Sequence, residues 1–586
     1  MHKRIRTSIV SISLATILIS TAWILFGLPA STYRKSDQSS AGKNTYQPGD
    51  TDKILLPFIS MQSNDATDIQ ASSLVTPANW TGELNIANSY LGHSVNSAGD
   101  VNGDGYDDVI VSAIGMMDTF NYLGKVLVYH GSATGLGVSP AWSSVGAWGH
   151  GDYGWSVSTA GDVNGDGYDD IIIGQIRYNG HNGRVYLFYG SPTGLASSPA
   201  WTYEGYLSSG ELGWSVSTAG DVNSDGFSDI VVGVPGKSQA YLFYGSVSGL
   251  SSQQDRILYG EQAGDRFGHS TSLAGDINAD GYDDIVIGAP YHIESSSVQT
   301  GKIYVYFGSS DGIENSPSWT MIGDVAAFSL FGWAVSHAGD VNNDGYADII
   351  ASAKSYYYAG VGSVGKAYAF YGTSNGLPSS PSWEVWGDIN DYNQRSMEFG
   401  ISLDAAGDIN GDGFDDIVVG ARGALISQGK AYAYYGSASG LATTHSCGNA
   451  GSQDNSEFGH AVASAGDVNN DGYADIVVGA PRYDNPENNE GLAYAYHGAP
   501  DPLVGLEIHV TEPVIPGATI NFSYTLVSGT PSSTQWAIVP DLTAYPITSN
   551  QPAFSATLPL RYFVELTVTN PISTLSTSEV FTVTSP

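Results

Sequence analysis

Cysteine and basic residues are scarce in this chain of 586 residues. The single cysteine, Cys447, excludes an intramolecular disulfide framework and a cluster of thiolate metal ligands. Only 21 Lys and Arg stand against 58 Asp and Glu, and the net charge of −37 argues against nucleic acid or an anionic membrane surface as a partner. Long helical periodicity is missing after residue 30, while 73 glycines indicate many tight turns between short strands.

The one long apolar run lies at the amino terminus. It extends from Ser8 to Leu28 behind three basic residues, so residues 1–30 are predicted to be a signal peptide or a membrane anchor. Residues 31–75 are rich in Ser, Thr, Asp and Gln and are predicted to be a low-complexity tether. We therefore expect an exported protein, secreted or held at the cell surface. Export without disulfides favours a bacterial envelope protein.

A nine-residue acidic motif occurs seven times between residues 100 and 475. Its first copy reads "DVNGDGYDD", and all copies have Asp at positions 1, 5 and 9, Asn at position 3 and Gly at position 6. Repetition at a period of roughly 60 residues indicates an array of structural units. The copies begin at Asp100, Asp162, Asp221, Asp276, Asp340, Asp408 and Asp467.

Each acidic motif lies inside a recurring cassette, shown by residues 267–313. This cassette predicts a short strand near 269–274, the acidic loop, a buried strand at 284–289 and an alternating strand at 302–307. A fourth strand is marked by tryptophan in five places. Four antiparallel strands repeated seven times predict an all-β fold, a seven-bladed β-propeller over residues 76–500. The five residues are Trp80, Trp142, Trp201, Trp319 and Trp383.

The two ends of this array complement each other. Residues 76–86 carry a tryptophan strand with no cassette before it, and the last cassette has no such strand after it. We predict that residues 79–86 pair with residues 491–497 and close the ring, which removes two exposed sheet edges. From Pro502 onward the acidic motif stops and apolar and polar residues alternate between turns, so residues 503–586 are predicted to be a small β-sandwich.

The acidic loops are predicted to bind calcium. Alternate residues of a tight loop can supply the six to eight oxygens that Ca²⁺ prefers, whereas Mg²⁺ favours octahedral sites that keep several waters. The same motif is also a good turn without any metal. Seven copies, each crowding three carboxylates that would repel one another, favour the metal. The predicted ligands are the side chains at positions 1, 3, 5 and 9 and the main-chain carbonyl at position 7: Asp100, Asn102, Asp104, Tyr106 and Asp108; Asp162, Asn164, Asp166, Tyr168 and Asp170; Asp221, Asn223, Asp225, Phe227 and Asp229; Asp276, Asn278, Asp280, Tyr282 and Asp284; Asp340, Asn342, Asp344, Tyr346 and Asp348; Asp408, Asn410, Asp412, Phe414 and Asp416; and Asp467, Asn469, Asp471, Tyr473 and Asp475.

The cassette resembles the FG-GAP repeat of integrin α-subunit propellers, over roughly residues 78–500. Phe-Gly stands at 267–268, 331–332, 399–400 and 458–459, and Gly-Ala-Pro at 288–290 and 479–481. The resemblance implies a seven-bladed propeller with up to seven Ca²⁺ ions in the loops between strands 1 and 2 of the blades. The first three Phe-Gly positions and five Gly-Ala-Pro positions differ, but these are packing and turn sites. No integrin-type inserted domain or leg follows, and the carboxy-terminal stretch resembles PKD immunoglobulin-like modules.

Three functions fit this sequence. The first is a binding or adhesion protein for a protein or glycan ligand, the second a calcium-dependent polysaccharide lyase or hydrolase, and the third a structural component of the cell envelope. Catalysis needs a general base in a cleft, and the candidates are His93, His269 and His460. These occupy the same repeat position as three tryptophans, which favours packing. We therefore predict no catalytic residues and prefer the binding protein.

The ligand is expected on the face opposite the calcium loops. In an up-and-down blade the connections between strands 2 and 3 emerge at the opposite end from those between strands 1 and 2. These 2–3 connections carry tyrosines, whose rings stack on sugars and whose hydroxyl groups form hydrogen bonds. Tyrosines that only cap the loops would give the same pattern. The predicted ligand residues are Tyr122, Tyr178, Tyr291, Tyr356, Tyr357, Tyr358 and Tyr483.

Overall fold

The computed structural model describes residues 78–118, 121–146, 152–294, 298–324, 328–359, 361–388 and 396–500, and the backbone of strands between residues 507 and 582. The predicted signal peptide or anchor and the predicted tether lie outside the described residues. In the part that is described, no helix has the length and apolar character needed to cross a membrane.

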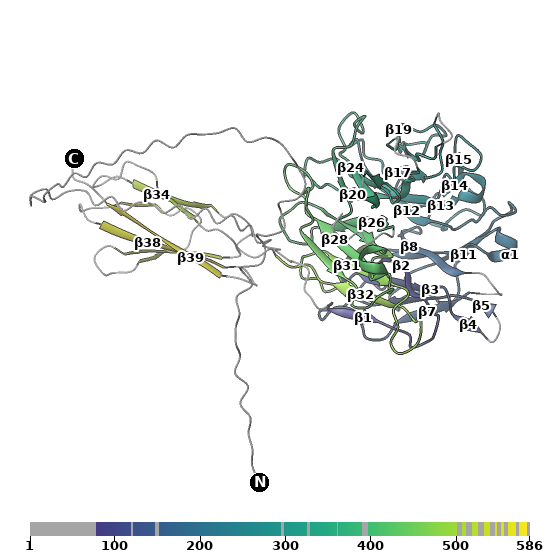
Figure 1. Cartoon of the computed structure of the whole chain (residues 1–586), viewed down its shortest axis with the longest axis horizontal. Helices are drawn as coiled ribbons and strands as arrows, with labels where there is room; N and C mark the ends of the chain where they lie inside the picture. Colours follow the sequence, from purple (N-terminus) through teal and green to yellow (C-terminus); the bar gives the residue numbers. More distant parts are fainter. Residues whose placement is uncertain are drawn as a thin grey trace, which may run out of the picture. The chain divides into compact units, whose positions relative to one another are not determined.

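Seven four-stranded antiparallel sheets follow one another along the chain, and each forms one blade (Figure 1). Blade 1 contains β2 (Leu91–Gly99), β3 (Asp108–Ala113), β6 (Lys125–Tyr129) and β7 (Trp142–Val145). Blade 2 contains β8 (Tyr153–Gly161), β9 (Asp170–Gln175), β10 (Arg184–Phe188) and β11 (Trp201–Glu204). Blade 3 contains β12 (Val216–Gly220), β13 (Asp229–Val234), β14 (Gln239–Phe243) and β15 (Arg256–Tyr259). Blade 4 contains β16 (Ser270–Gly275), β17 (Asp284–Ala289), β18 (Lys302–Tyr306) and β19 (Trp319–Ile322). Blade 5 contains β20 (Phe331–Gly339), β21 (Asp348–Ala353), β24 (Lys366–Phe370) and β25 (Trp383–Trp386). Blade 6 contains β26 (Phe399–Gly407), β27 (Asp416–Ala421), β28 (Lys430–Tyr434) and β29 (Cys447–Ala450). Blade 7 contains β30 (Ala461–Gly466), β31 (Asp475–Ala480), β32 (Leu492–Tyr496) and β1 (Trp80–Gly82).

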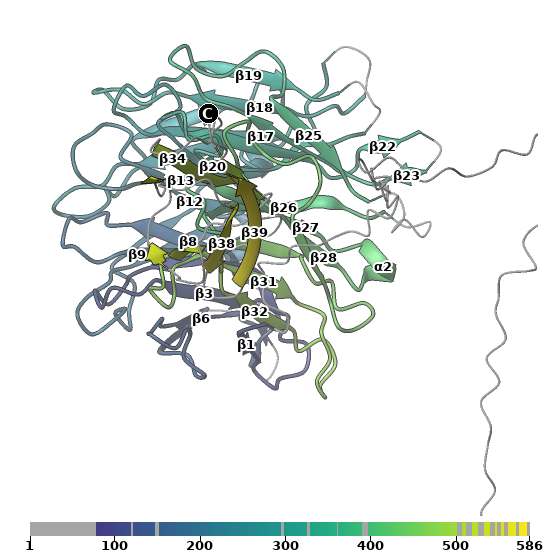
Figure 2. The same ribbon diagram turned by 90° about the vertical axis from the view of Figure 1, so that its left-hand side faces the viewer.

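The blades stand around a common centre (Figure 2). The first strand of each blade contacts the first strand of the next, and β30 of blade 7 contacts β2 of blade 1. These strands line a central cavity of about 170 Å³. The protein is a seven-bladed β-propeller, as the sequence predicts. The strands of blade 4 lie within one residue of the positions expected from the cassette.

Hydrophobic packing lies between the blades. Every residue of each second strand is buried, as in "DIVIGA" of β17, because neighbouring blades cover both faces of the sheet. One hydrophobic cluster connects each pair of neighbours, including blades 7 and 1. The tryptophans at the start of fourth strands connect the blades further, since the indole nitrogens of Trp142 and Trp383 donate to carbonyl oxygens of the next blade.

The amino-terminal strand closes the ring, as predicted. Trp80, Thr81 and Gly82 pair antiparallel with Ala495, Tyr494 and Ala493. The pairing is shorter than the predicted 79–86. Trp80 is 7% exposed, its ring lies 4.7 Å from that of Tyr129 in blade 1, and its indole nitrogen donates to the Gly137 carbonyl at 2.9 Å. Trp80 therefore connects blade 7 to blade 1.

Short elements occupy several connections between strands 2 and 3. They are the hairpins β4 (Met117–Asp118) with β5 (Asn121–Tyr122) and β22 (Tyr357–Tyr358) with β23 (Gly362–Ser363), the helices α1 (Tyr178–His181) and α2 (Ala424–Ser427), and the 3-10 turn η1 (Pro235–Lys237). The β4–β5 hairpin and α1 lie at the same end of the propeller (Figure 1). This end is opposite the acidic loops, because those loops join strands 1 and 2.

The carboxy-terminal strands form two antiparallel sheets. One contains β33 (Glu507–Val510), β34 (Thr519–Thr525) and β37 (Ala553–Ser555). The other contains β36 (Tyr545–Ile547), β35 (Ser533–Val539), β38 (Arg561–Thr569) and β39 (Thr574–Thr582). Their backbone agrees with an all-β segment, and a PKD-like sandwich stays a prediction.

Candidate metal centres and the opposite face

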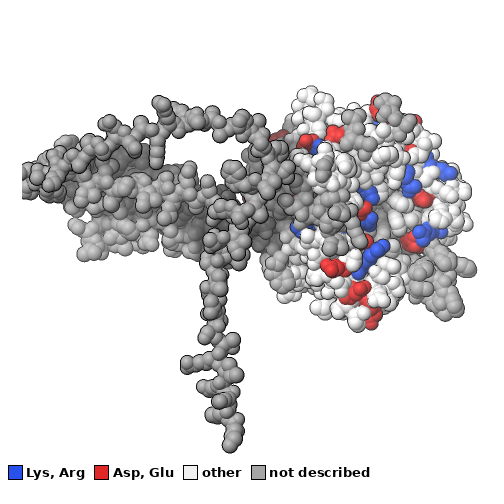
Figure 3. Space-filling view, viewed as in Figure 1, with Lys and Arg blue, Asp and Glu red and all other residues white. Residues whose placement is uncertain are grey.

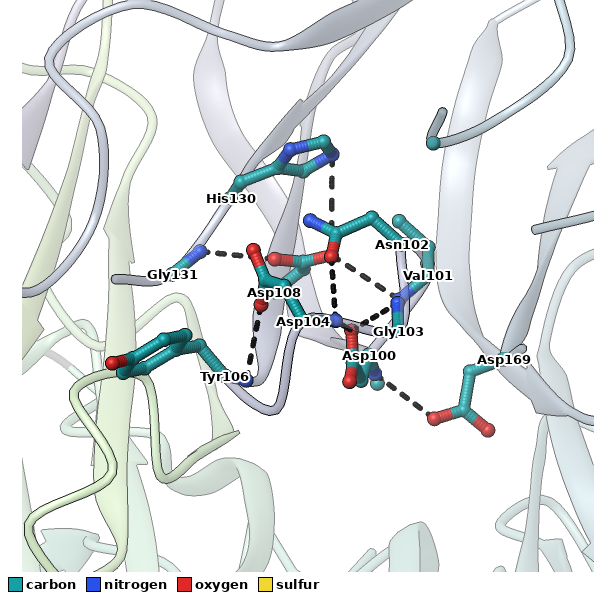
Figure 4. A network of polar contacts seen from close by, with 12 residues as sticks. Asp100, Val101, Asn102, Gly103, Asp104, Tyr106, Asp108, His130, Gly131 and Asp169 are labelled. Carbon is teal, nitrogen blue, oxygen red and sulfur yellow. Dashed lines mark hydrogen bonds and ion pairs between the residues drawn. The ribbon is translucent and has the colours of Figure 1, made fainter. Parts of the chain in front are cut away.

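The acidic loop of blade 1 folds around the carboxylate of Asp100 (Figure 4). One oxygen of this carboxylate accepts hydrogen bonds from the amides of Gly103 and Asp104, and the other accepts one from Gly105 at 2.8 Å. The Asn102 side chain accepts a bond from the Asp104 amide at 2.9 Å. Gly105 has a φ of 87°, a conformation that favours glycine and turns the chain back toward β3.

All seven loops share this geometry. In each loop the position-5 amide donates to the Asp at position 1 and to the Asn at position 3. The position-6 amide donates to the second oxygen of that Asp at 2.7–2.8 Å. Main-chain hydrogen bonds therefore fix the side chains at positions 1 and 3, two of the predicted metal ligands of each loop.

The Asp at position 9 begins the second strand of each blade and is buried. Asp108 is 0% exposed, and its two oxygens accept hydrogen bonds from the amides of Val101 and Gly131. Equivalent bonds recur in the other six blades. In the described part of the chain, none of the seven carboxylates has an ion pair with Lys or Arg.

Burial raises the pKa of these seven carboxyl groups, and the other Asp residues of each loop raise it further, while the main-chain hydrogen bonds oppose the change. The pKa rises to about 7 for Asp108, Asp229, Asp284 and Asp348, to about 8 for Asp170 and Asp475, and to about 9 for Asp416.

The loop residues fit a hard cation in their chemistry. Each loop offers only oxygen donors, and the buried position-9 charge has no Lys or Arg partner among the described residues. Within those residues, however, no three His, Cys, Asp or Glu side chains are already gathered as metal ligands. Their carboxylates instead accept main-chain hydrogen bonds. Bound calcium would draw the side chains at positions 1, 3, 5 and 9 together and supply the positive charge that the loop lacks.

The residue at position 8 has a function that the sequence did not reveal. Asp169 of blade 2 accepts a hydrogen bond at 2.9 Å from the amide of Asp100 in blade 1 (Figure 4). Equivalent bonds join blades 3 and 4, 5 and 6, and 7 and 1, through Asp283, Asp415 and Asp107. Four such hydrogen bonds thus connect acidic loops of neighbouring blades.

Two imidazoles lie beside the acidic loops and were also missed. The Nε2 atom of His130 lies 4.0 Å from the Asp108 carboxylate, and Nδ1 of His497 lies 3.2 Å from the Asn469 amide nitrogen. Burial lowers the pKa of both, against the opposing charges of the loop carboxylates. Both follow the third strand of their blade, where other repeats have Tyr or Phe.

An open row of aromatic rings, called the aromatic girdle, runs across six of the seven blades on the opposite face. It consists of His460, His93, Trp155, Trp214, His269 and Trp333, and successive ring centroids lie 4.3–5.5 Å apart. The girdle lies at the end of the blades away from the acidic loops. In blade 2, Trp155 lies two residues after Tyr153, and Tyr153 pairs with Gln175, the last residue of the second strand. The three histidines therefore pack in the girdle. Burial lowers the pKa of all three, for His269 to about 3, which makes each a poor general base near neutral pH.

Charged side chains border the aromatic girdle. Arg266 lies 4.6 Å from the Trp214 ring and pairs with Glu211 at 2.7 Å. The Nζ atom of Lys354 lies 3.6 Å from the centroid of Trp333. In the view of Figure 3, basic and acidic side chains alternate on the propeller and form no single patch.

The predicted ligand tyrosines differ in exposure. Tyr357 is 56% exposed, whereas Tyr356 packs on the core between blades 4 and 5 and Tyr483 on that between blades 6 and 7. Tyr178 accepts a hydrogen bond from Arg184, Tyr291 and Tyr358 are half-buried, and the Tyr122 side chain lies outside the described residues. Sequence analysis missed four more exposed aromatic residues on the same face: Tyr206, Tyr259, Phe328 and Trp386.

Comparison with known families identifies the repeat. The FG-GAP repeat family matches residues 267–306, 331–370, 399–437 and 458–496, and the FG-GAP-like repeat family matches residues 100–173 and 162–232. The chain carries FG-GAP repeats. The matched stretches include the seven acidic loops.

Similar curated proteins are integrin α subunits. Integrin alpha-5 of Xenopus laevis is 34% identical over 219 residues, which are 36% of this chain and 20% of the integrin. Integrin alpha-8 of Gallus gallus is 33% identical over 227 residues, which are 38% of this chain and 21% of the integrin. The chain thus spans about a fifth of the length of these relatives.

Two solved PKD domains were found by structural similarity. One is from human VPS10 domain-containing receptor SorCS2, with 16% identity, a TM-score of 0.13 and coverage of 14% of this chain and 76% of that domain. The other is the PKD1 domain of Vibrio anguillarum Epp, with 18% identity, a TM-score of 0.12 and coverage of 14% and 94%. Similarity at this level supports no argument about the carboxy-terminal sheets.

Proposed function

We propose that this protein is an exported, calcium-binding FG-GAP propeller that binds a protein or glycan ligand at the cell surface or after secretion. The observation that carries the proposal is the set of seven buried position-9 carboxylates, which have no Lys or Arg partner in the described residues. A buried charge without a partner is costly, and a bound cation removes that cost. The oxygen-only loops favour calcium.

The ligand would bind to the face opposite the calcium loops. All five exposed aromatic residues of the described chain, Tyr206, Tyr259, Phe328, Tyr357 and Trp386, lie in or at the ends of connections on this face. Exposed aromatic residues mark contact surfaces because they bury a large area and lose little side-chain entropy. The similarity to integrin α subunits supports an adhesion-type function for such a surface.

Binding explains this face better than catalysis does. The candidate general bases His93, His269 and His460 are packed in the aromatic girdle with lowered pKa values. A base with such a pKa has little driving force for proton abstraction near neutral pH. Rigid aromatic rings bordered by paired charges are instead well suited to stacking against sugars or side chains.

Calcium binding is tested by counting bound ions after equilibrium dialysis. We expect up to seven ions per chain, and about one fewer when Asp284→Asn removes the position-9 carboxylate of one loop. Asp311→Asn is the matched control, because this exposed Asp lies in the same blade outside the acidic loop. A wild-type protein that binds no calcium would refute the metal sites.

Ligand binding is tested on immobilised glycans and matrix proteins. Tyr357→Ala and Trp386→Ala should each weaken binding at least about tenfold, because exposed aromatic contacts often contribute 1–2 kcal/mol or more. Val247→Ala is the control, since this residue is 84% exposed in the 3–4 connection of blade 3, on the face of the acidic loops. Equal loss in the control would move the ligand to the calcium face.

A further inference from the structure

The 2–3 connection of blade 7 buries a carboxylate that lacks a hydrogen-bond partner. Glu490 is 0% exposed, and neither of its carboxylate oxygens has a hydrogen-bond partner. One carboxylate oxygen of Glu487 is also buried without a partner. Burial, together with the neighbouring carboxylates of Glu487 and Glu83, raises the pKa of Glu490 to about 7. Glu490 therefore has acidic neighbours on both sides of the junction, although the three carboxylates are not gathered as a finished ligand set.

This place is the junction that closes the propeller. Glu83 directly follows Gly82, the last residue of the closing strand β1. The amides of Asn88 and Leu91 donate to the carbonyls of Asn488 and Glu490 at 2.8 and 3.0 Å. Side-chain bonds add to this contact, from Asn485 to Glu83 and from Asn489 to Asn88, each at 3.2 Å. The segment between β1 and β2 is thus docked on the loop that carries Glu490.

Five other blades have a basic side chain at the corresponding place. The third strand begins with Lys or Arg in five blades, at Lys125, Arg184, Lys302, Lys366 and Lys430, and with Gln239 in blade 3. Lys302 pairs with Glu261 at 2.7 Å, and Lys366 pairs with Asp324 and Glu384. In blade 2, Arg184 stands opposite Glu204, which occupies the position of Glu83.

Blade 7 lacks this basic residue. Its third strand begins with Leu492, and Arg482 of the same connection pairs with Glu457 instead. Among the described residues, Glu83, Glu487 and Glu490 have no ion pair with Lys or Arg. Blade 7 therefore gathers acidic side chains where five of the other blades place a positive charge.

We propose that Glu490 and Glu487, together with Glu83, bind a divalent cation of the calcium type at the ring-closure junction. This site is separate from the seven acidic loops and lies at the opposite end of the blade. Two or three carboxylates, with amide oxygens of the surrounding asparagines and water, make an oxygen set that calcium accepts. The ion takes the place of the missing lysine and holds the closing segment on blade 7. The site does not depend on calcium binding to the loops.

Hydrogen exchange measured by mass spectrometry on the full-length protein tests this site. Peptides over residues 83–91 and 484–491 report on the junction, and peptides over the acidic loops report on the loops separately. The measurement is made at about pH 8, above the raised pKa of Glu490, so that a proton does not replace the metal. We expect calcium to slow exchange at the junction. In Glu490→Gln this slowing should disappear, and about one ion fewer should bind per chain.

Glu204→Gln is the matched control, because this Glu occupies the place of Glu83 in blade 2 but faces Arg184. It should keep the full number of ions and the full protection at the junction. If Glu490→Gln does not fold, Glu487→Gln serves instead.

Three outcomes would overturn the junction site. Calcium could protect the loops but not residues 83–91, which would leave the proposed function intact. Glu490→Gln could bind as many ions as the wild type. In metal-free buffer the variant could also be more stable than the wild type, while it binds the full number of ions when calcium is added. This result would show that Glu490 and Glu487 share a proton. Protection at the junction but not in the loops would instead refute the loop sites alone.

Discussion

Without calcium, the propeller should become less stable as the pH rises. The seven position-9 carboxyl groups have pKa values of about 7 to 9 in the fold, whereas an unfolded Asp titrates near 4. Between these values the folded protein holds protons that the unfolded chain has released. Stability is therefore full below about pH 4 and is lost progressively as the pH rises through about 7 to 9.

The magnitude follows from the pKa shifts. Each carboxyl group that takes up a proton on folding lowers the free energy of unfolding by about 1.4 kcal/mol per pH unit. For Asp284, with a pKa of about 7, the total loss by about pH 8 is on the order of 4 kcal/mol. A domain has only about 5–15 kcal/mol of net stability, so a few such groups decide whether the metal-free ring stays folded. Calcium supplies the opposing charge and removes this loss.

The assay is urea or thermal unfolding across about pH 5 to 8, in metal-free buffer and with about 5 mM calcium, which exceeds the 10⁻⁴–10⁻³ M dissociation constants of extracellular sites. Metal is removed with a chelating resin, because EGTA loses its calcium affinity in acid. We expect calcium to raise stability more at about pH 8 than at about pH 5. Metal-free stability that is flat or rises over this range, or an equal calcium effect at both ends, would refute the reasoning.

Three smaller changes test the rest of the ring. Trp80→Ala should lower the free energy of unfolding by more than the roughly 3–5 kcal/mol expected for a buried tryptophan. The loss should also exceed that of Trp383→Ala at a similarly buried residue, because only Trp80 lies on the closing strand. Urea unfolding compares the two variants, and equal losses would contradict this role. Ala279→Gly should raise stability by about 1 kcal/mol, because Ala279 has a φ of 56°, and an unchanged melting temperature would argue against strain there. Asp169→Ala should lower the free energy of unfolding by about 1.5–3 kcal/mol, because the Asp100 amide loses its carboxylate partner. The same change should weaken calcium binding in the blade-1 loop, and a calcium titration that shows unchanged affinity would contradict this coupling.

The blade architecture could be predicted from the sequence because every signal for it is repeated. The acidic motif fixes where the first strand ends and the second begins. The five residues after position 9 are buried in all seven blades, and all of them are apolar or small except Gln175 of blade 2. The closing strand was predictable as well. The last cassette lacks a Trp strand, and an additional Trp strand stands before the first cassette. Seven repeats thus distinguish a propeller sequence from a turn motif that occurs by chance.

The remaining features depend on contacts between distant residues or on single positions. Position 8 varies between Asp, Ser and Ala, and the partner of Asp169 lies 69 residues away, so no local pattern indicates the bond. Glu490 occurs once, and the absence of a basic residue beside it is evident only from comparison with the third strands of the other blades. Sequence indicates the tyrosines of the 2–3 connections by residue type alone, whereas their exposure depends on how each connection folds. Tyr357 therefore remains exposed while Tyr356 packs on the core.

The closure by β1 also determines how the propeller responds to mechanical force. Trp80 pairs with Ala495 in an antiparallel ladder, so the chain enters β1 at the same end of the ladder at which it leaves β32. Tension applied through the two flanking segments would pull these strands apart from that end and break their hydrogen bonds one after another. Loading in this unzipping direction is resisted less than shear along the strands. A propeller tethered at one flank and loaded at the other would therefore yield first at the three-residue closure, while the other six blades stay intact.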